Sequence, residues 1–428
     1  MDRRIAFLSE HASPAAQLGG EDAGGQNVYV DEISRNLARV GYKVDVFTRR
    51  QQPDTPEVID WAPGVRIVNV TAGPPDFLLK DNLWRFMPAF RDAILAFSRR
   101  DGIHYDAIHS NFWMAGWVAT ELRQQLHVPV VQIFHALGKA KRLHQGTADT
   151  SSDERIEVEL RIVRQVDRLI AQCPYEHTEL IRDYGADPAK LAIIPAGVNT
   201  RIFRPVDHAV ARRRIGLDPE GPVVVYVGRM LPRKDVRNVV RALACLREPV
   251  TLLVVGGETE EPDPVATPEI GELMRLAHEL GIAERVRCVG RRQQDVLRYY
   301  YSAGDVAVTT PWYEPFGLTP LEAMACGRPV IGSSVGGISY TIVDGVTGFL
   351  VPPRDPEALA ARLREIFSTP ERRAHMGEEA RCRVQREFMW PLTARRTAEV
   401  YESLLEERRE MTAAAGQRTG GSPREIAV

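Results

Sequence analysis

Short runs of β-branched residues alternate with helix-like stretches along most of this 428-residue chain, and the whole series occurs twice. Most of the runs are continuously apolar and rich in Val and Ile, without regular alternation with polar residues. Continuous apolar runs are typical of strands that helices cover on both faces, as in a parallel sheet. The alternation of strands with helices therefore predicts a doubly wound α/β fold, and its repetition predicts two such domains.

The two series are separated by a stretch rich in Pro and Arg, Asn199–Pro222, which we interpret as a linker. We therefore place a first domain at residues 1–203 and a second at 204–389. In the first, strands are expected at Arg4–Ser9, Lys43–Thr48, Val65–Val70, Ala107–His109, Pro129–Phe134, Arg168–Gln172 and Leu191–Ile194. In the second, they are expected at Val223–Val227, Val250–Val255, Val286–Val289, Val306–Thr310, Pro329–Gly332 and Gly348–Val351. Two facing sheets of this kind would bring the carboxyl ends of their strands to one cleft.

Composition narrows the classes of partner. A formal net charge of -2 gives no electrostatic reason to expect nucleic acid as a partner, and no apolar run reaches the ~18 residues of a membrane span. The five cysteines are widely spaced and odd in number, which argues against a disulfide framework and against structural zinc. The N-terminus lacks the pattern of a signal peptide. We expect a cytoplasmic protein, with homodimerisation left open, and a C-terminal tail without regular structure at 411–428.

The segment Trp312–Gly327 is the strongest candidate for a binding site, because it follows a predicted strand and leads into a helix. Thr319 is typical of a helix N-cap, and Pro320 of the first helical position. The free backbone amides at such a helix start suit an anion such as a diphosphate. Three residues are expected to direct these amides to the cleft: Gly317, Leu318 and Thr319.

Two carboxylates, Glu314 and Glu322, stand eight residues apart in this segment. Glu314 lies between aromatic residues in a Gly- and Pro-rich loop, where a carboxylate gains little structurally but would suit sugar hydroxyls. Glu322 has two interpretations. Together with Thr319 it matches the Thr-x-x-Glu pattern of a capping box, or it binds a ligand.

Two further segments follow predicted strands. Gly228–Asp235 carries several cations that could neutralise a diphosphate leaving group, although a solvated basic turn would have the same composition. Gly19–Asn27 combines glycines, which allow close approach of a ligand, with a helix start. It does not fit the dinucleotide fingerprint G-x-G-x-x-G, and a mobile turn would look the same.

Individual side chains are ambiguous without a comparison. His109 and His135 stand at strand ends, where a histidine is often structural. Lys80 lies in a predicted loop. Arg155 and Glu159 have the i,i+4 spacing of an ordinary surface pair, and Arg155 alternatively faces the cleft.

The paired glutamates resemble the signature of retaining GT-B glycosyltransferases of family 4, also called group 1, and the resemblance extends to about residue 408. It implies two facing Rossmann-like domains with a cleft between them, and a last helix at 390–408 that crosses back to the first domain. It also implies transfer of a hexosyl group from a nucleotide-diphosphate sugar. Retention at the anomeric carbon is part of this expectation.

The resemblance assigns the donor sugar to Glu314 and the ribose diol to Glu322. It assigns the pyrophosphate to Arg229 and Lys234, although Asp235 replaces the Gly that usually follows this Lys. The residues expected on the donor side are Gly25, Arg229, Lys234, Arg291, Glu314, Phe316, Gly317, Leu318, Thr319 and Glu322. Those expected to act directly in the reaction are Glu314, His135, Arg229 and Lys234.

The acceptor side is similar to that of sucrose-phosphate synthases and mycothiol-pathway glycosyltransferases, whose relatives carry a His-Ser-His-Tyr-Trp segment. Here that segment reads His109-Ser110-Asn111-Phe112-Trp113, so the second His is Asn111. The residues expected on the acceptor side are Asn27, Lys80, His109, Asn111 and Arg155. A UDP-sugar is favoured as the donor, a GDP-sugar is the alternative, and the acceptor is expected to be small and polar.

The chain contains no Asp-x-Asp pair, so we expect no metal ion and no cofactor, with cations and helix-end amides taking the place of a metal. Two alternatives stay open. One is a different enzyme on the same scaffold, namely a nucleotide-sugar epimerase or hydrolase, or a phosphorylase. The other is a non-catalytic module that binds nucleotide-sugars.

Overall fold

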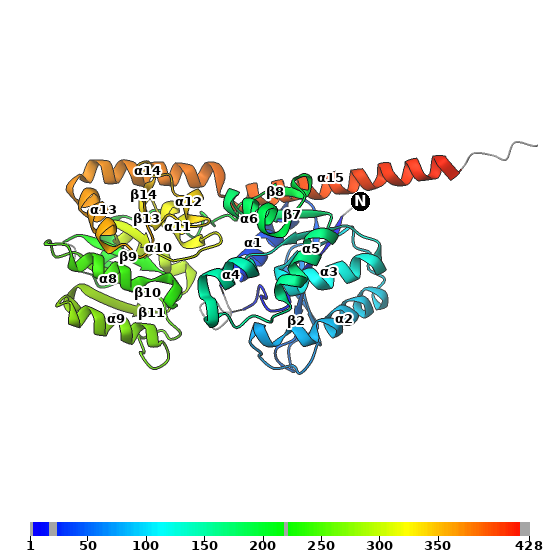
Figure 1. The fold of residues 1–428 in the computed structure, drawn as a ribbon, viewed down its shortest axis with the longest axis horizontal. Coiled ribbons are helices and arrows are strands. Elements are labelled where there is room, and N and C mark those ends of the chain that lie inside the picture. Colours follow the sequence, from blue (N-terminus) through cyan, green and yellow to red (C-terminus); the bar gives the residue numbers. More distant parts are fainter. Residues whose placement is uncertain (1–2, 17–23, 218–220, 420–428) are drawn as a thin grey trace, which may run out of the picture.

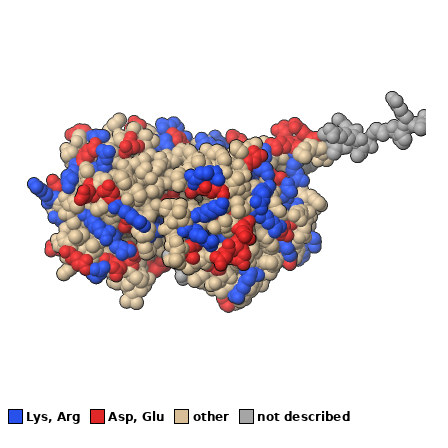
Figure 2. Space-filling view, viewed as in Figure 1, with Lys and Arg blue, Asp and Glu red and all other residues tan. Residues whose placement is uncertain are grey.

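A computed structural model of the chain describes residues 3–16, 24–217 and 221–419. It contains two α/β domains side by side, each a twisted sheet with helices on both faces (Figure 1). Each domain is therefore doubly wound, as the sequence predicts. Positive and negative side chains are interspersed over the face shown in Figure 2, in keeping with the small net charge.

The sheet of the first domain has eight strands in the described part of the chain, in the order β3-β4-β2-β1-β5-β6-β7-β8. Its strands pair in parallel, except that β3 is antiparallel to β4. Their bounds are β1 Arg4–Leu8, β2 Lys43–Arg49, β3 Val58–Ala62, β4 Val65–Val70, β5 Ala107–Asn111, β6 Val130–Ile133, β7 Arg168–Ala171 and β8 Leu191–Ile193.

The sheet of the second domain has six strands in the described part of the chain, in the order β11-β10-β9-β12-β13-β14, and neighbouring strands pair in parallel. Their bounds are β9 Val223–Val227, β10 Thr251–Val255, β11 Val286–Gly290, β12 Val306–Thr309, β13 Val330–Ser333 and β14 Gly348–Val351. All thirteen predicted strands are present within two residues at each end. The sequence missed β3, a short edge strand whose side chains are only half-buried and whose central residue, Asp60, is exposed.

The helices connect these strands and cover the sheets. In the first domain they are α1 Gly25–Arg39, α2 Met87–Arg100, α3 Phe112–Leu126, α4 Gly138–Gln145, α5 Arg155–Gln165 and α6 Pro174–Tyr184. From the linker onward they are α7 His208–Arg214, α8 Val236–Ala244, α9 Pro268–Glu279, α10 Gln294–Ala303, α11 Leu318–Ala325, α12 Ile338–Thr341, α13 Pro356–Ser368, α14 Pro370–Glu387 and α15 Trp390–Thr419. Short 3₁₀ helices are η1 Lys80–Asn82, η2 Trp84–Phe86, η3 Gly146–Ala148, η4 Pro188–Lys190, η5 Pro232–Lys234 and η6 Ala283–Arg285. No helix among the described residues is long and apolar enough to cross a membrane.

The last helix, α15, leaves the second domain and runs along the first (Figure 1). It packs on α1, with Trp390 edge-on to Tyr29 and Tyr401 edge-on to Tyr42. The helix continues through Thr419, so the prediction of an irregular tail is wrong for residues 411–419. The reason is that Ala413, Ala414 and Ala415 are strong helix formers. The rest of the predicted tail, 420–428, lies outside the described residues.

The two connections between the domains lie against each other. Val198 pairs with Met389 in an isolated bridge, and its amide donates to the Phe388 carbonyl at 2.8 Å. A Cβ on Gly197 would come within 2.5 Å of the Trp390 amide nitrogen, so this close approach requires glycine.

We expect Tyr401→Ala to lower the free energy of unfolding by about 3–5 kcal/mol, as other large-to-small aromatic substitutions in cores do. Tyr401 is fully buried against the first domain, and its hydroxyl is a 2.7 Å hydrogen-bond partner of His109 Nδ1. Met411→Ala on the same helix is the control, because Met411 is 72% exposed and its loss should change stability by less than about 0.5 kcal/mol. Thermal and urea unfolding would measure both. Equal effects would show that α15 is not docked in solution.

Candidate functional site

A cleft of about 390 Å³ lies between the two domains, and much of its wall comes from residues that follow strand ends. Its lining includes residues after β1, β5, β6, β7 and β8 of the first domain, and after β9, β10, β11 and β12 of the second. The carboxyl ends of two parallel sheets therefore meet at one site, as doubly wound folds place their ligands. The volume suits a drug-sized or nucleotide-sized ligand.

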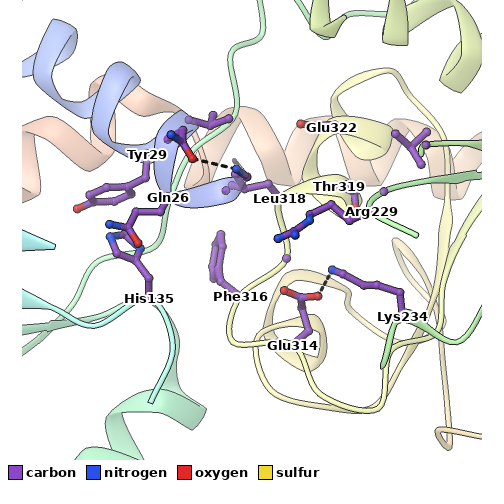
Figure 3. Close-up of a pocket in the computed structure, with 18 of the residues that line it drawn as sticks. Gln26, Tyr29, His135, Arg229, Lys234, Glu314, Phe316, Leu318, Thr319 and Glu322 are labelled. Carbon is purple, nitrogen blue, oxygen red and sulfur yellow. Dashed lines mark hydrogen bonds and ion pairs between the residues drawn. The ribbon is translucent and has the colours of Figure 1, made fainter. Parts of the chain in front are cut away.

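Glu314 and Lys234 form a partly buried ion pair on the second-domain side (Figure 3). Lys234 Nζ donates to Glu314 Oε2, and Arg233 Nη1 lies 3.5 Å from the same oxygen. Burial favours the neutral acid, but the charges of Lys234 and Arg233 outweigh it and hold the pKa of Glu314 below its ordinary value. Burial also lowers the pKa of Lys234, against the opposing effect of Glu314. The pair is thus a fixed carboxylate beside fixed cations.

Glu322 is not part of a capping box, so that interpretation of the sequence is wrong. Gly317, at φ 88°, is the N-cap of α11, so the helix begins two residues earlier than Thr319 as N-cap predicts. Glu322 instead accepts a 2.8 Å hydrogen bond from the Tyr301 hydroxyl while lining the cleft. Burial raises the pKa of Glu322 to about 7, against a smaller lowering by Tyr301.

The starts of two helices face each other across the cleft. The starts of α1 and α11 approach so closely that a Cβ on Gly25 would lie 3.5 Å from Leu318 Cδ1. Arg229 approaches the same place, because a Cβ on Gly24 would lie 3.9 Å from Arg229 Cδ. Figure 3 shows Leu318, Arg229 and Thr319 on this part of the wall. Two sets of free amides and a guanidinium therefore converge where an anion can bind.

Asp235, the departure from the family pattern, has a structural explanation. Its φ is 49°, a left-handed conformation that Gly adopts freely and Asp tolerates. Its carboxylate accepts a 2.8 Å hydrogen bond from the Trp312 indole, which leads into the Glu314 loop. The turn is therefore kept, and the added charge is used to hold that loop.

His135 lines the cleft as a neutral ring. Burial, together with the charges of His109 and His11, lowers its pKa to about 3. Its Nε2 lies 3.0 Å from Asn111 Oδ1, and Gln172 Nε2 lies 3.4 Å from its Nδ1. Because both nitrogens are engaged, the ring contributes shape and polarity to the cleft but no free base.

Three residues expected on the acceptor side do not line the cleft. His109 is fully buried, bonded to Tyr401 through Nδ1. Asn111 is buried behind His135. Arg155 is 1% exposed and pairs with Glu159 at 2.8 Å, so it is neither a surface residue nor a cleft residue. The i,i+4 spacing was correct, but only tertiary packing decides which face of α5 is covered.

The other expected residues come together in the cleft: Gly25, Asn27, Lys80, Arg229, Lys234, Arg291, Glu314, Phe316, Gly317, Leu318, Thr319 and Glu322. Residues Gly19–Ala23 of the glycine-rich segment lie outside the described residues. Sequence reasoning missed several first-domain residues of the wall: His11, Gln26, Tyr29, Phe112, Ala136 and Gln172. Four of these could have been found by the strand-end rule, since His11, Phe112, Ala136 and Gln172 follow within about three residues of a strand end.

Comparisons with known proteins agree with this geometry. Residues 23–202 match the model of glycosyltransferase family 4, and residues 207–383 match that of glycosyl transferases group 1. D-inositol 3-phosphate glycosyltransferase 2 of Catenulispora acidiphila is 39% identical, with 96% of this chain and 97% of that protein covered. The chain belongs to glycosyltransferase family 4.

Further relatives support this assignment to family 4. D-inositol 3-phosphate glycosyltransferase of Streptomyces scabiei is 38% identical over 95% of this chain and 92% of its own. The solved structure of sucrose-phosphate synthase from Thermosynechococcus elongatus superimposes with a TM-score of 0.86. It is 37% identical and covers 95% of this chain and all of its own. The fold is therefore GT-B, with two facing Rossmann-like domains.

We expect the stability of the wild type, relative to Glu322→Gln, to fall as the pH rises from about 5 to 7.5. The raised pKa of about 7 means that the folded state keeps a proton which the unfolded state releases near pH 4.3. Between these values the unfolded state binds fewer protons, so each pH unit costs the folded state up to about 1.4 kcal/mol. Urea titrations at several pH values would measure the difference. A flat difference would mean that Glu322 is ionised throughout.

Proposed function

We propose that this enzyme transfers a hexosyl group from a nucleotide-diphosphate sugar to a small polar acceptor, with retention at the anomeric carbon and without a metal ion. A UDP-sugar is the favoured donor and a GDP-sugar the alternative, following the sequence resemblance to sucrose-phosphate and mycothiol-type enzymes. The relatives named D-inositol 3-phosphate glycosyltransferase and sucrose-phosphate synthase support glycosyl transfer to a cyclitol or a sugar.

The observation that carries the proposal is the concentration of cationic groups around Glu314. Lys234 and Arg233 contact its carboxylate, and Arg229 lies against the facing helix starts (Figure 3). A departing nucleotide diphosphate gains negative charge as the glycosidic phosphate bond breaks. Cations fixed in advance stabilise that charge more than they stabilise the bound donor, which accelerates the step.

In the proposed reaction, the acceptor oxygen bonds to the anomeric carbon on the face from which the diphosphate leaves. The bond between that carbon and the phosphate oxygen breaks, and the departing phosphate oxygen takes the acceptor proton. Glu314 accepts hydrogen bonds from the sugar hydroxyls, and its charge is held by Lys234. Glu322 binds the ribose. His135, neutral and without a free nitrogen, packs beside the sugar and takes no proton.

The domains also enclose the reaction. His144 of α4 stacks on Tyr313 of the second domain, with ring centroids 4.9 Å apart and planes at 14°. Tyr313 directly precedes Glu314 in the sequence, and its contact with His144 joins the two domains. Enclosure of this kind excludes water and limits hydrolysis of the donor.

The test is turnover of UDP- and GDP-sugars with a panel of polyols and sugars, with the product followed by proton NMR. An α-linked product from an α-linked donor, formed at the same rate with a chelator present, is expected. An inverted product, or activity abolished by the chelator and restored by a divalent cation, would contradict the proposed mechanism. Epimerised sugar, or free sugar as the main product with every acceptor, would favour the alternative enzymes.

We expect Lys234→Gln to lower kcat by about 10²- to 10³-fold, since fixed charges at a developing anion have effects of this size. Because the substitution also leaves Glu314 with fewer charge partners, the double variant Lys234→Gln/Glu314→Gln is needed to separate folding from catalysis. Arg275→Gln is the matched control, because Arg275 forms only exposed ion pairs with Glu272 and Glu279. If the Lys234 variant keeps the melting temperature and the kcat of the wild type, Lys234 has no part in the reaction.

A further inference from the structure

The cations of the cleft are unevenly divided between the domains. Of the described residues that line it, the second domain supplies Arg229, Arg233, Lys234, Arg291 and Arg292, whereas the first supplies a single Lys or Arg, Lys80. The first-domain wall otherwise presents uncharged hydrogen-bonding groups and apolar surface. The diphosphate side of the cleft is therefore strongly cationic, and the side left for the acceptor is not.

Arg155 lies behind the first-domain wall, and its guanidinium nitrogens already donate hydrogen bonds within the protein. Its Nε donates to Glu159 at 2.8 Å, Nη1 to Ser151 at 3.2 Å and Nη2 to the Ala136 carbonyl at 2.6 Å. Glu159 is in turn held by the Gly138 amide and the Tyr184 hydroxyl, at 2.9 and 2.7 Å. Turning Arg155 to a ligand would leave a buried carboxylate without its cation, which is costly.

Phe112 closes the wall over Arg155. The guanidinium carbon lies 4.9 Å from the centre of the Phe112 ring, and Phe112 itself lines the cleft. The residue adopts φ 75°, a conformation that a bulky side chain rarely takes, so its placement is imposed by the surrounding structure. An acceptor in the cleft would therefore contact the Phe112 ring and not the Arg155 guanidinium behind it.

A buried carboxyl group, that of Glu10, lies behind the same wall. Glu10 is fully buried, with Oε1 2.7 Å from Nδ1 of His11, a residue of the cleft wall. Its Oε2 has no hydrogen-bond partner among the described residues.

We propose that the acceptor of this enzyme is an uncharged polyhydroxyl compound, such as a free cyclitol or a neutral glycoside, and not a sugar phosphate. This inference rests on the proposed glycosyl transfer. A phosphate monoester carries about -1.5 to -2 charges at pH 7 and requires several cations or donors when it leaves water. A single ammonium group, that of Lys80, is a poor match for such an anion. Hydroxyl groups are matched by His11, Gln26 and Gln172.

The first experiment compares matched acceptors with the donor that supports turnover: myo-inositol and its 3-phosphate, glucose and its 6-phosphate, fructose and its 6-phosphate. For each pair in which the enzyme glycosylates at least one member, the unphosphorylated compound should have at least a tenfold higher kcat/KM than the phosphorylated one. A phosphorylated member that equals or exceeds its partner would overturn the inference and leave the proposed transfer standing.

A second experiment does not depend on finding the natural acceptor. Inorganic phosphate is titrated by calorimetry into enzyme saturated with the nucleoside diphosphate, which occupies the cationic side. No saturable binding is expected at millimolar concentrations. Saturable binding that Lys80→Ala abolishes would overturn the inference. Enzyme that binds neither UDP nor GDP, nor their sugars, would contradict the proposed function instead, so the two failures are distinguishable.

The substitution Glu10→Gln replaces the buried carboxyl group with an uncharged amide of the same shape. It should raise kcat/KM for a phosphorylated acceptor, relative to its neutral partner, by several-fold. Glu57→Gln is the matched control, because Glu57 is a half-exposed first-domain carboxylate that pairs with Arg100. An unchanged ratio in Glu10→Gln, with a wild-type melting temperature, would show that Glu10 has no part in acceptor selection.

Discussion

The cleft depends on a balance of charge around one carboxylate. Arg233, Lys234 and the amides of two helix starts are directed into a small volume, and such groups repel one another when they are taken out of water. Glu314 supplies the opposing charge and is kept ionised by the same cations. The residue that orients the sugar in the proposed mechanism is thus also the one that stabilises the cationic groups of the cleft before any ligand binds.

The architecture could be predicted well from the sequence because strands and helices are determined mainly by short stretches of neighbouring residues. Continuous Val- and Ile-rich runs identify strands covered on both faces, and the strand-end rule then places the glycine-rich segment, the basic turn and the Trp312 loop at one cleft. The edge strand β3 escaped detection because an edge has neither strong burial nor regular alternation. Asp235 departs from the Gly that the family usually has at this position, and the sequence alone does not explain the difference. The explanation is the left-handed conformation of Asp235, which only the folded turn reveals.

The candidate site was less predictable where burial decides the outcome. His109, Asn111 and Arg155 occupy the positions that the resemblance suggests, yet each is held behind the wall by a partner distant in sequence or on another element: Tyr401, His135 and the Ala136 carbonyl. Glu322 was ambiguous between two local interpretations. It is neither a simple cap nor a free ligand, because Tyr301 of α10 binds it. These contacts between distant segments cannot be predicted from the spacing of residues along the sequence.

The paired crossings at Val198 and Met389 have a mechanical consequence. A single covalent link would allow one domain to swivel as well as bend relative to the other. Two links that are hydrogen-bonded to each other act as a double hinge, so the easy motion is rotation about one axis that opens and closes the cleft. Gly197, which lets the two links touch, is therefore a residue of the hinge that lies outside the wall of the cleft.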